Sequence, residues 1–158
     1  MSARLQLAVS VQNHVGRKGV PLARSFEQWV RAALAGRKSG RVEIGIALFG
    51  EAEARRLNRD YRGKDYATNV LSFPYEAIRS ERSPTLGDLA ICPRVVAREA
   101  RAQGKRARDH FAHLTVHGTL HLLGYDHERA RDAAAMEAIE RRVLAGLGIP
   151  DPYEIPDA

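Results

Sequence analysis

The chain contains a single cysteine, Cys92, among its 158 residues. One cysteine cannot form an internal disulfide, and it cannot build a zinc site from several thiolates. Cys92 ends the apolar run Leu89-Ala90-Ile91, and the sequence assigns no charged partner to its thiol. We therefore expect a small buried side chain rather than a nucleophile.

Long apolar runs and aromatic residues are also scarce. No stretch approaches the roughly 20 apolar residues of a membrane span, and Met1-Ser2-Ala3-Arg4-Leu5 lacks the apolar core of a secretory signal. We therefore expect a cytoplasmic protein without a membrane partner. Aromatic residues make up 6% of the chain, and they do not resemble a platform for stacking bases.

Acidic residues are fewer than lysine and arginine residues, which gives the chain a net charge of +6 and a pI near 9.9. The excess of lysine and arginine gathers in two segments, 55–64 and 93–110. Basic clusters of this kind favour a polyanionic partner, whereas the alternative is an ordinary solvated surface. The candidate phosphate contacts are Arg59, Arg94, Arg98 and Arg101.

The periodicity of apolar residues predicts an α+β fold, a small four-stranded mixed sheet covered by helices. With 44% hydrophobic residues, the chain is long enough for one domain with a substantial core. We expect this domain to span 1–149 and the proline-containing segment 150–158 to be an extended or disordered tail. Strands are predicted at 5–11, 41–49, 70–73 and 86–91, helices at 21–35, 51–60, 93–103, 106–123 and 128–145, and a polar, turn-like segment at 61–68.

Three histidines, His117, His121 and His127, have a spacing typical of metal ligands. Residues four apart share one face of a helix, so the first two imidazoles can reach one point. Gly124 follows at a position where a helix can end in the left-handed conformation, which would bring His127 back toward that point. Three histidines with a fourth position left for water are one way in which proteins hold catalytic zinc.

The surrounding residues favour the metal over a chance clustering of histidines. The helix predicted at 106–123 is apolar on almost every side, which indicates that it is buried. Buried imidazoles need partners and would repel one another if protonated, and a metal ion meets both requirements. His113, one turn earlier, is expected to support the ligands or to be a satisfied core residue, and His110 and His14 to be structural or exposed.

Three segments resemble the family of YbeY-type rRNA maturation factors, zinc-dependent endoribonucleases of the bacterial cytosol. They are LNRDYRGKDYATNVLSFP at 57–74, LGDLAIC at 86–92 and HLTVHGTLHLLGYDH at 113–127. The resemblance runs from about Leu57 to Glu140.

This resemblance implies a small sheet packed with helices and one zinc per chain, held by His117, His121 and His127. It also implies a functional arginine at Arg62 and RNA as the substrate, chiefly in rRNA maturation and ribosome quality control. The expected activity is cleavage within single-stranded RNA, with rRNA precursor or the ribosome as partner and no DNA.

The residues leave two other interpretations open. The histidine spacing also matches metzincin proteases, in which a glutamate general base follows the first histidine. Here that position is Gly118, so a peptidase would lack its proton acceptor. The other interpretation is a non-catalytic ribosome-assembly or RNA-binding factor with structural zinc, although such a site normally has four protein ligands.

Two further residues are candidates for catalysis, Arg62 and Asp126. Arg62, in the polar segment 61–68, could stabilise charge on a phosphate, or it could be an ordinary surface arginine. Asp126, next to the third histidine, could orient an imidazole or accept a proton. It could equally hydrogen-bond backbone amides of the turn.

Overall fold

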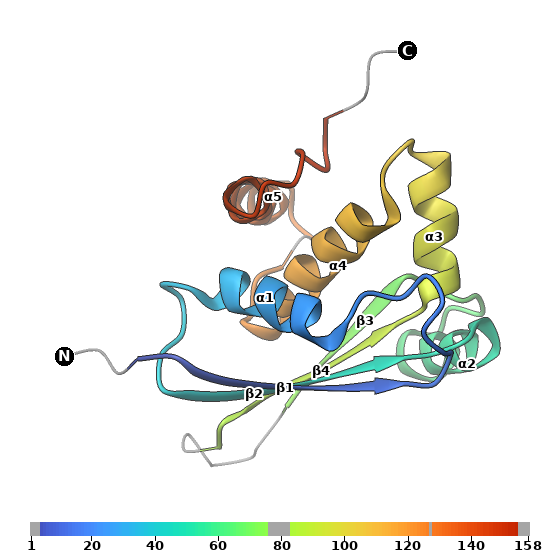
Figure 1. Ribbon diagram of the computed structural model, residues 1–158, viewed down its shortest axis with the longest axis horizontal. Helices are drawn as coiled ribbons and strands as arrows, with labels where there is room; N and C mark the ends of the chain where they lie inside the picture. The colour runs from blue at the N-terminus through green and yellow to red at the C-terminus, as the bar shows by residue number, and fades with distance from the viewer. Residues whose placement is uncertain (1–3, 76–82, 127, 155–158) are drawn as a thin grey trace.

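The computed structural model describes residues 4–75, 83–126 and 128–154 of the chain (Figure 1). Within these ranges four strands and five helices form the fold predicted from the sequence. In chain order they are β1 (Gln6–Asn13), α1 (Ala23–Leu34), β2 (Arg41–Leu48), α2 (Glu51–Arg62), β3 (Val70–Pro74), β4 (Thr85–Ile91), α3 (Pro93–Ala102), α4 (Ala107–Leu122) and α5 (Ala130–Gly146).

The four strands form one mixed sheet in the order β1-β2-β4-β3. Strand β2 pairs in parallel with both β1 and β4, whereas β3 runs antiparallel to β4. The sheet therefore has three parallel strands and one antiparallel edge strand. This arrangement confirms the predicted mixed sheet.

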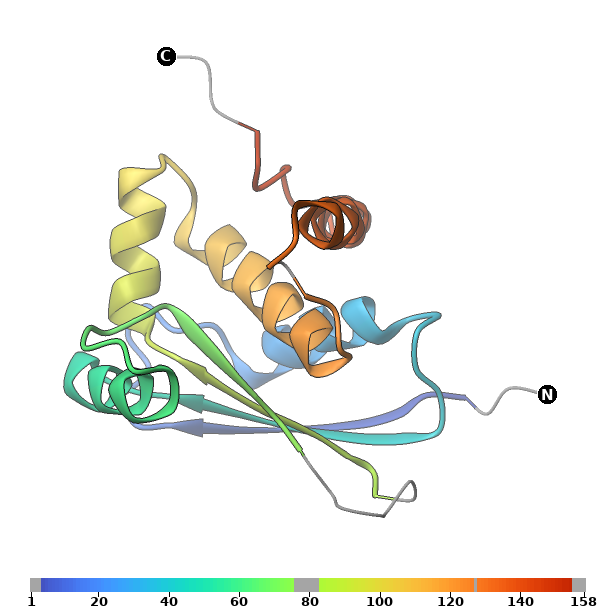
Figure 2. The same ribbon diagram turned by 180° about the vertical axis from the view of Figure 1, so that it is seen from behind.

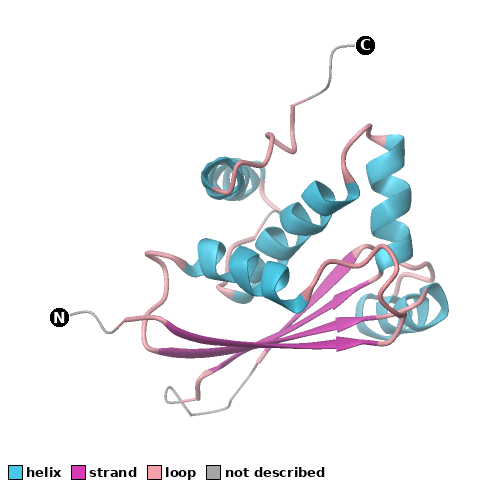
Figure 3. Ribbon diagram, in the orientation of Figure 1, coloured by secondary structure: helices cyan, strands magenta, loops and turns pink. Residues whose placement is uncertain are grey.

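One face of the sheet is buried beneath helices. Every second side chain of β2 is buried, from Val42 through Ile44 and Ile46 to Leu48. Helices α1 and α4 lie over this face, and α5 packs outside them (Figures 2 and 3). On the opposite face Asp88 is exposed and Ala47 is half-buried. The alternation that predicted the strands therefore separates a covered face from a more accessible one.

Helix α4 is the central helix of the molecule. It contacts β3, β4, α1, α3 and α5, and its buried residues lie on almost every side, as predicted from the sequence. The helix ends in a Schellman motif: Gly124 has φ +100°, its N–H donates to His121 O, and the Tyr125 N–H donates to Leu120 O. The predicted turn after His121 is thus present.

The end of α2 differs from the prediction, which placed Arg62 in a polar turn after a helix ending at residue 60. The helix continues to Arg62 and ends at Gly63, which has φ +72° and donates its N–H to Arg59 O. Glycine adopts this left-handed conformation without a Cβ clash, so Gly63 determines where the helix stops. Arg62 is therefore held by the last turn of a helix.

No helix in the described ranges combines the length and the apolar composition that crossing a membrane requires. Of the proline-containing segment at the end of the chain, residues 150–154 belong to the described structure. Asp151, Pro152 and Tyr153 are half-buried there.

Candidate metal centre

Four histidines occupy one side of α4. The ring centroids of His110 and His113 are 6.1 Å apart, those of His113 and His117 are 6.1 Å apart, and those of His117 and His121 are 4.5 Å apart. The spacing of three and four residues produces this row, because such positions follow one another along a helix face. All four histidines border a cavity of about 700 Å³.

His117 and His121 present the same ring nitrogen to one another, with 3.1 Å between the two Nε2 atoms. The other nitrogen of each ring has an oxygen acceptor: His121 Nδ1 lies 2.9 Å from Tyr125 O, and His117 Nδ1 bonds the Glu140 carboxylate. Two imidazoles bound to one tetrahedral zinc at about 2.0–2.1 Å would have their nitrogens about 3.3 Å apart. The pair therefore fits a shared metal ion.

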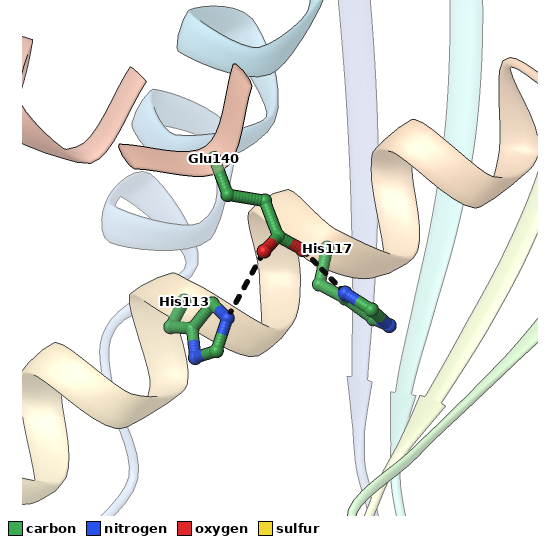
Figure 4. A group of neighbouring side chains, drawn as sticks. All are labelled: His113, His117 and Glu140. Atoms are coloured by element: carbon green, nitrogen blue, oxygen red, sulfur yellow. Dashed lines mark hydrogen bonds and ion pairs between the residues drawn. The ribbon is translucent and has the colours of Figure 1, made fainter. Parts of the chain in front are cut away.

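The Glu140 carboxylate lies directly behind this pair. Its side chain is fully buried, and its oxygens contact His113 and His117 (Figure 4). A carboxylate oxygen also accepts from the Tyr153 hydroxyl. Burial alone raises the pKa of Glu140, but the hydrogen bonds from His113, His117 and Tyr153 outweigh it and lower the pKa to about 2. Glu140 is therefore a charged acceptor inside the protein.

The described residues offer a second possible ligand set, namely His113, His117 and Glu140. One ligand atom from each lies within 4.8 Å of the others. This set would use His117 Nδ1, whereas the pair with His121 uses Nε2. A hydrogen bond already joins His117 Nδ1 to Glu140, so an ion between these two atoms would have to replace it. His127, the third predicted ligand, lies outside the described residues.

Arg62 and Asp126 border the same cavity as His113, His117 and His121. Arg62 comes from the last turn of α2, and Asp126 from the turn after α4. The Glu128 N–H donates to Asp126 Oδ1 at 3.1 Å, which is the turn-stabilising role considered for Asp126 from its sequence position. The fold thus brings both candidate catalytic residues to the cavity that the histidines border.

The four arginines proposed to contact phosphates are all exposed, on α2 and α3, and do not border the cavity. Arg98 forms an ion pair with Glu51, and Arg59 Nε lies 3.4 Å from Asp60 Oδ1. A surface ion pair is weak enough to be exchanged for a phosphate. The four residues are Arg59, Arg94, Arg98 and Arg101.

His110 and Cys92 have the structural character expected of them. His110 is 4% exposed, and its Nε2 lies 2.9 Å from Glu99 Oε1. Burial lowers the pKa of His110, against the opposing effect of Glu99. Cys92 is 1% exposed, and burial raises the pKa of its thiol, so it is poorly suited to act as a nucleophile.

Glu140, Tyr153 and Lys105 also border or support the cavity, and the sequence pattern assigned none of them a role. One signal for Glu140 was present in the sequence. It stands four residues from Met136 and from Leu144, in a stripe that is buried in α5. A charged residue within an apolar stripe requires a partner.

The fold and the cavity define a small α+β protein with a histidine-based candidate metal centre. The family described as Endoribonuclease YbeY matches residues 10–148. A protein of Alkalilimnicola ehrlichii named Endoribonuclease YbeY is 59% identical to this chain, over 88% of this chain and 86% of that relative. A second protein of that name, from Xanthomonas oryzae pv. oryzae, is 54% identical to this chain over 94% of each chain. The chain belongs to the YbeY family.

A solved structure agrees with this assignment at the level of the fold. The solution structure of TM1509 from Thermotoga maritima matches with a TM-score of 0.59 and 24% sequence identity. The match covers 93% of this chain and 99% of that protein. At this identity the likeness concerns the arrangement of the strands and helices.

Proposed function

We propose that this protein is a metal-dependent endoribonuclease, a hydrolase that cleaves phosphodiester bonds within RNA. The observation that carries the proposal is the pair of His117 and His121 Nε2 atoms, 3.1 Å apart, in a cavity that Arg62 also borders. The names of the relatives support the same activity. A metal beside an arginine suits a reaction in which negative charge accumulates on phosphate oxygens.

We further propose that the metal is zinc, one ion per chain, held by His117, His121 and His127. Neutral imidazole is a preferred zinc ligand, and a site with three protein ligands leaves a fourth position for the reaction. Zinc there would supply Lewis-acid chemistry, since it lowers the pKa of water and polarises phosphate oxygens. His113, one turn before His117, supports the ligand row through its contacts with Glu140 and Tyr153.

In our proposal one side chain acts on the phosphate and another on the proton of the attacking hydroxyl group. Arg62 donates hydrogen bonds to the phosphate oxygens and stabilises the charge that develops there, because a guanidinium can bind two oxygens at once. Asp126 accepts the proton of the attacking hydroxyl, which belongs to water or to the ribose. Their common position at the cavity supports both roles.

The proposed substrate is single-stranded RNA, in particular an rRNA precursor in the ribosome, acted on in the cytoplasm during rRNA maturation and ribosome quality control. The net charge of +6 favours a polyanion. The exposed residues Arg59, Arg94, Arg98 and Arg101 would bind its backbone. DNA and membranes are not expected partners.

The metalloprotease interpretation is disfavoured by the surroundings of Gly118. A Cβ atom at this position would lie 2.8 Å from Leu89 Cδ2 and 3.3 Å from Ser72 Oγ. The side of α4 that would carry a glutamate general base is therefore pressed against the sheet. A non-catalytic factor with structural zinc is disfavoured by the cavity, which leaves space beside the histidines that a closed four-ligand site would not need.

A cleavage assay on three kinds of polymer tests the proposed function. Protein stripped with a chelator and then reloaded with zinc is incubated with single-stranded RNA, single-stranded DNA and a denatured polypeptide. We expect cleavage of RNA alone, only after reloading, and none by His117→Ala. The matched control is His14→Ala, because His14 is exposed and stacks on Phe49 away from the cavity. Peptide cleavage, or RNA cleavage by stripped protein, would contradict the proposal.

A further inference from the structure

A carboxylate that water does not reach lies behind the candidate metal centre. Glu140 is 0% exposed, and a buried carboxylate is unstable in the fold unless its oxygens accept hydrogen bonds. Oε1 bonds His117 Nδ1, Oε2 bonds the Tyr153 hydroxyl, and Oε2 also lies 3.5 Å from His113 Nε2. Both oxygens are therefore directed at residues around the cavity.

The chemistry of the partners sets the direction of these hydrogen bonds. An ionised carboxylate only accepts, so the Tyr153 hydroxyl and His117 Nδ1 must donate. A neutral imidazole that carries its proton on Nδ1 has its lone pair on Nε2. Figure 4 shows the second ring nitrogen of His117 on the side away from Glu140. That nitrogen is the one 3.1 Å from His121 Nε2.

Tyr153 belongs to the segment that follows α5, and several contacts hold it in place. Its backbone N–H donates to Asp151 Oδ1 at 2.8 Å, and Asp151 also accepts from Arg141 Nε at 3.2 Å. The Arg141 guanidinium lies 5.1 Å from the centre of the Tyr153 ring. The Tyr153 and His113 rings also lie in a T-shaped arrangement, with 5.3 Å between centroids.

A hydrogen bond from Lys105 also holds the segment that carries Tyr153. Lys105, between α3 and α4, donates to Pro152 O at 2.8 Å. The segment is thereby attached to α5 through Arg141 and to the connection between α3 and α4 through Lys105. The contacts of Arg141 and Lys105 consequently keep the Tyr153 hydroxyl next to the Glu140 carboxylate.

We propose that Glu140 and Tyr153 are positioning residues of the metal centre. Glu140 holds the His117 ring in the tautomer and orientation that place Nε2 toward the ion, and Tyr153 fixes the carboxylate through its second oxygen. The segment after α5 is then part of the functional centre, although it contributes no reacting atom. This inference rests on the proposed function, in which His117 binds the metal through Nε2.

Zinc affinity, measured by competition with a chromogenic chelator, tests this inference on the full-length protein. Outer carboxylates that hold a ligating histidine typically contribute 10–100-fold in metal affinity. We expect Glu140→Gln to weaken zinc binding by about that factor, because an amide is a poorer acceptor for Nδ1–H and cannot accept fully from both partners. We expect a smaller effect for Tyr153→Phe, which keeps the ring contacts and removes only the hydroxyl.

The double variant separates positioning from a general structural effect. Since Tyr153 acts through Glu140, Glu140→Gln with Tyr153→Phe should bind zinc as Glu140→Gln does, with no additional weakening. The visible spectrum of the cobalt-loaded variants should also change, because the geometry at the metal shifts. Matched controls are Glu27→Gln, at a half-buried position, and Tyr75→Phe, at an exposed one; neither residue borders the cavity, and both variants should retain native affinity and spectrum.

Three outcomes would overturn the inference. The first is a zinc affinity equal to the native value in both Tyr153→Phe and Glu140→Gln, which would leave the proposed function intact. If Glu140→Gln does not fold, unchanged zinc affinity in Tyr153→Phe alone overturns the inference. A zinc-loaded crystal structure with a Glu140 oxygen about 2.0–2.2 Å from the ion would make Glu140 a ligand instead. A native protein that binds no metal would overturn the inference and the zinc assignment together.

Discussion

His121 provides a direct test of the ligand assignment at the scale of single residues. His121→Ala removes one of the two Nε2 atoms that lie 3.1 Å apart, so the variant should lose bound zinc. Zinc content after dialysis, measured by mass spectrometry, is expected to fall from about one ion per chain to near zero. His14→Ala is the control and should keep its zinc. Full occupancy in His121→Ala would remove this residue from the centre.

Arg62 should matter for cleavage more than for binding. Its position at the cavity suits charge that develops in the transition state. Arg62→Ala should keep zinc and most RNA affinity and lose cleavage by roughly a hundredfold or more, the scale for one preorganised donor. Arg62→Lys should recover little, because an ammonium cannot bind two oxygens as a guanidinium does. Single-turnover rates at saturating enzyme measure this effect, and native rates in Arg62→Ala would contradict it.

His110 should make the metal-free protein sensitive to mild acid. Burial lowers its pKa below 6.5 in the folded state, so the unfolded chain takes up the proton first as the pH falls. The stability that comes from keeping His110 neutral is present above about pH 6.5 and is lost below it. Between about pH 7 and pH 5 the free energy of unfolding should therefore fall less steeply in His110→Gln. Urea unfolding with a chelator present measures the two slopes, and identical slopes would contradict this expectation.

At the scale of elements, the close approach of α4 to the sheet depends on Gly118. The Ser72 hydroxyl lies 3.3 Å from Gly118 O, and a Cβ atom would come within 2.8 Å of Leu89 Cδ2. Leu89 is fully buried and cannot move aside freely. This is a physical reason for glycine at a position where the helix would otherwise favour alanine.

Gly118→Ala should therefore destabilise the protein, although alanine is the better helix former. We expect the free energy of unfolding to fall by about 1–2 kcal/mol, because overpacking exceeds the helix propensity gained. Gly146→Ala in α5 is the control, because a Cβ there meets nothing within 4 Å. That variant should be unchanged or up to about 1 kcal/mol more stable. Denaturant unfolding of both proteins checks the difference, and a stabilised Gly118→Ala would contradict the packing argument.

The boundaries of the elements follow mostly from local signals. Gly63 and Gly124 end their helices in left-handed conformations, and apolar periodicity places the strands and the five helices within a few residues. The end of α2 was placed two residues too early because the polar composition of 61–68 suggested a turn. Only the backbone conformation of Gly63 shows that the helix includes Arg62.

At the scale of the whole molecule, the positive charge should appear in the salt dependence of RNA binding. If the exposed arginines of α3 bind phosphates, affinity should fall linearly on a logarithmic salt scale as counterions are released. Arg94→Gln should reduce that slope by about 0.7, the value for one arginine that neutralises one phosphate of a single strand. Arg31→Gln is the control, because Arg31 lies on α1 and pairs with Glu27. An unchanged slope in Arg94→Gln would assign Arg94 to an ordinary solvated surface.

The sequence by itself determined the features that depend on neighbours along the chain. The spacing of four between His117 and His121 places both rings on one helix face, and the apolar residues around them predict that the helix is buried. Gly124 predicts the turn that follows. Helix geometry and backbone sterics are local, so these features can be read from a short window.

Only the tertiary structure decided what surrounds those histidines. Glu140 lies 23 residues from His117, and Tyr153 lies 13 residues further on. Neither distance has a helical or strand period, so the pattern of residues could not pair them. The strand order β1-β2-β4-β3 was likewise undetermined by periodicity. These contacts form because the packing of α5 on α4 buries a carboxylate that must then find donors, and the nearest donors are two histidines of α4 and a tyrosine beyond α5.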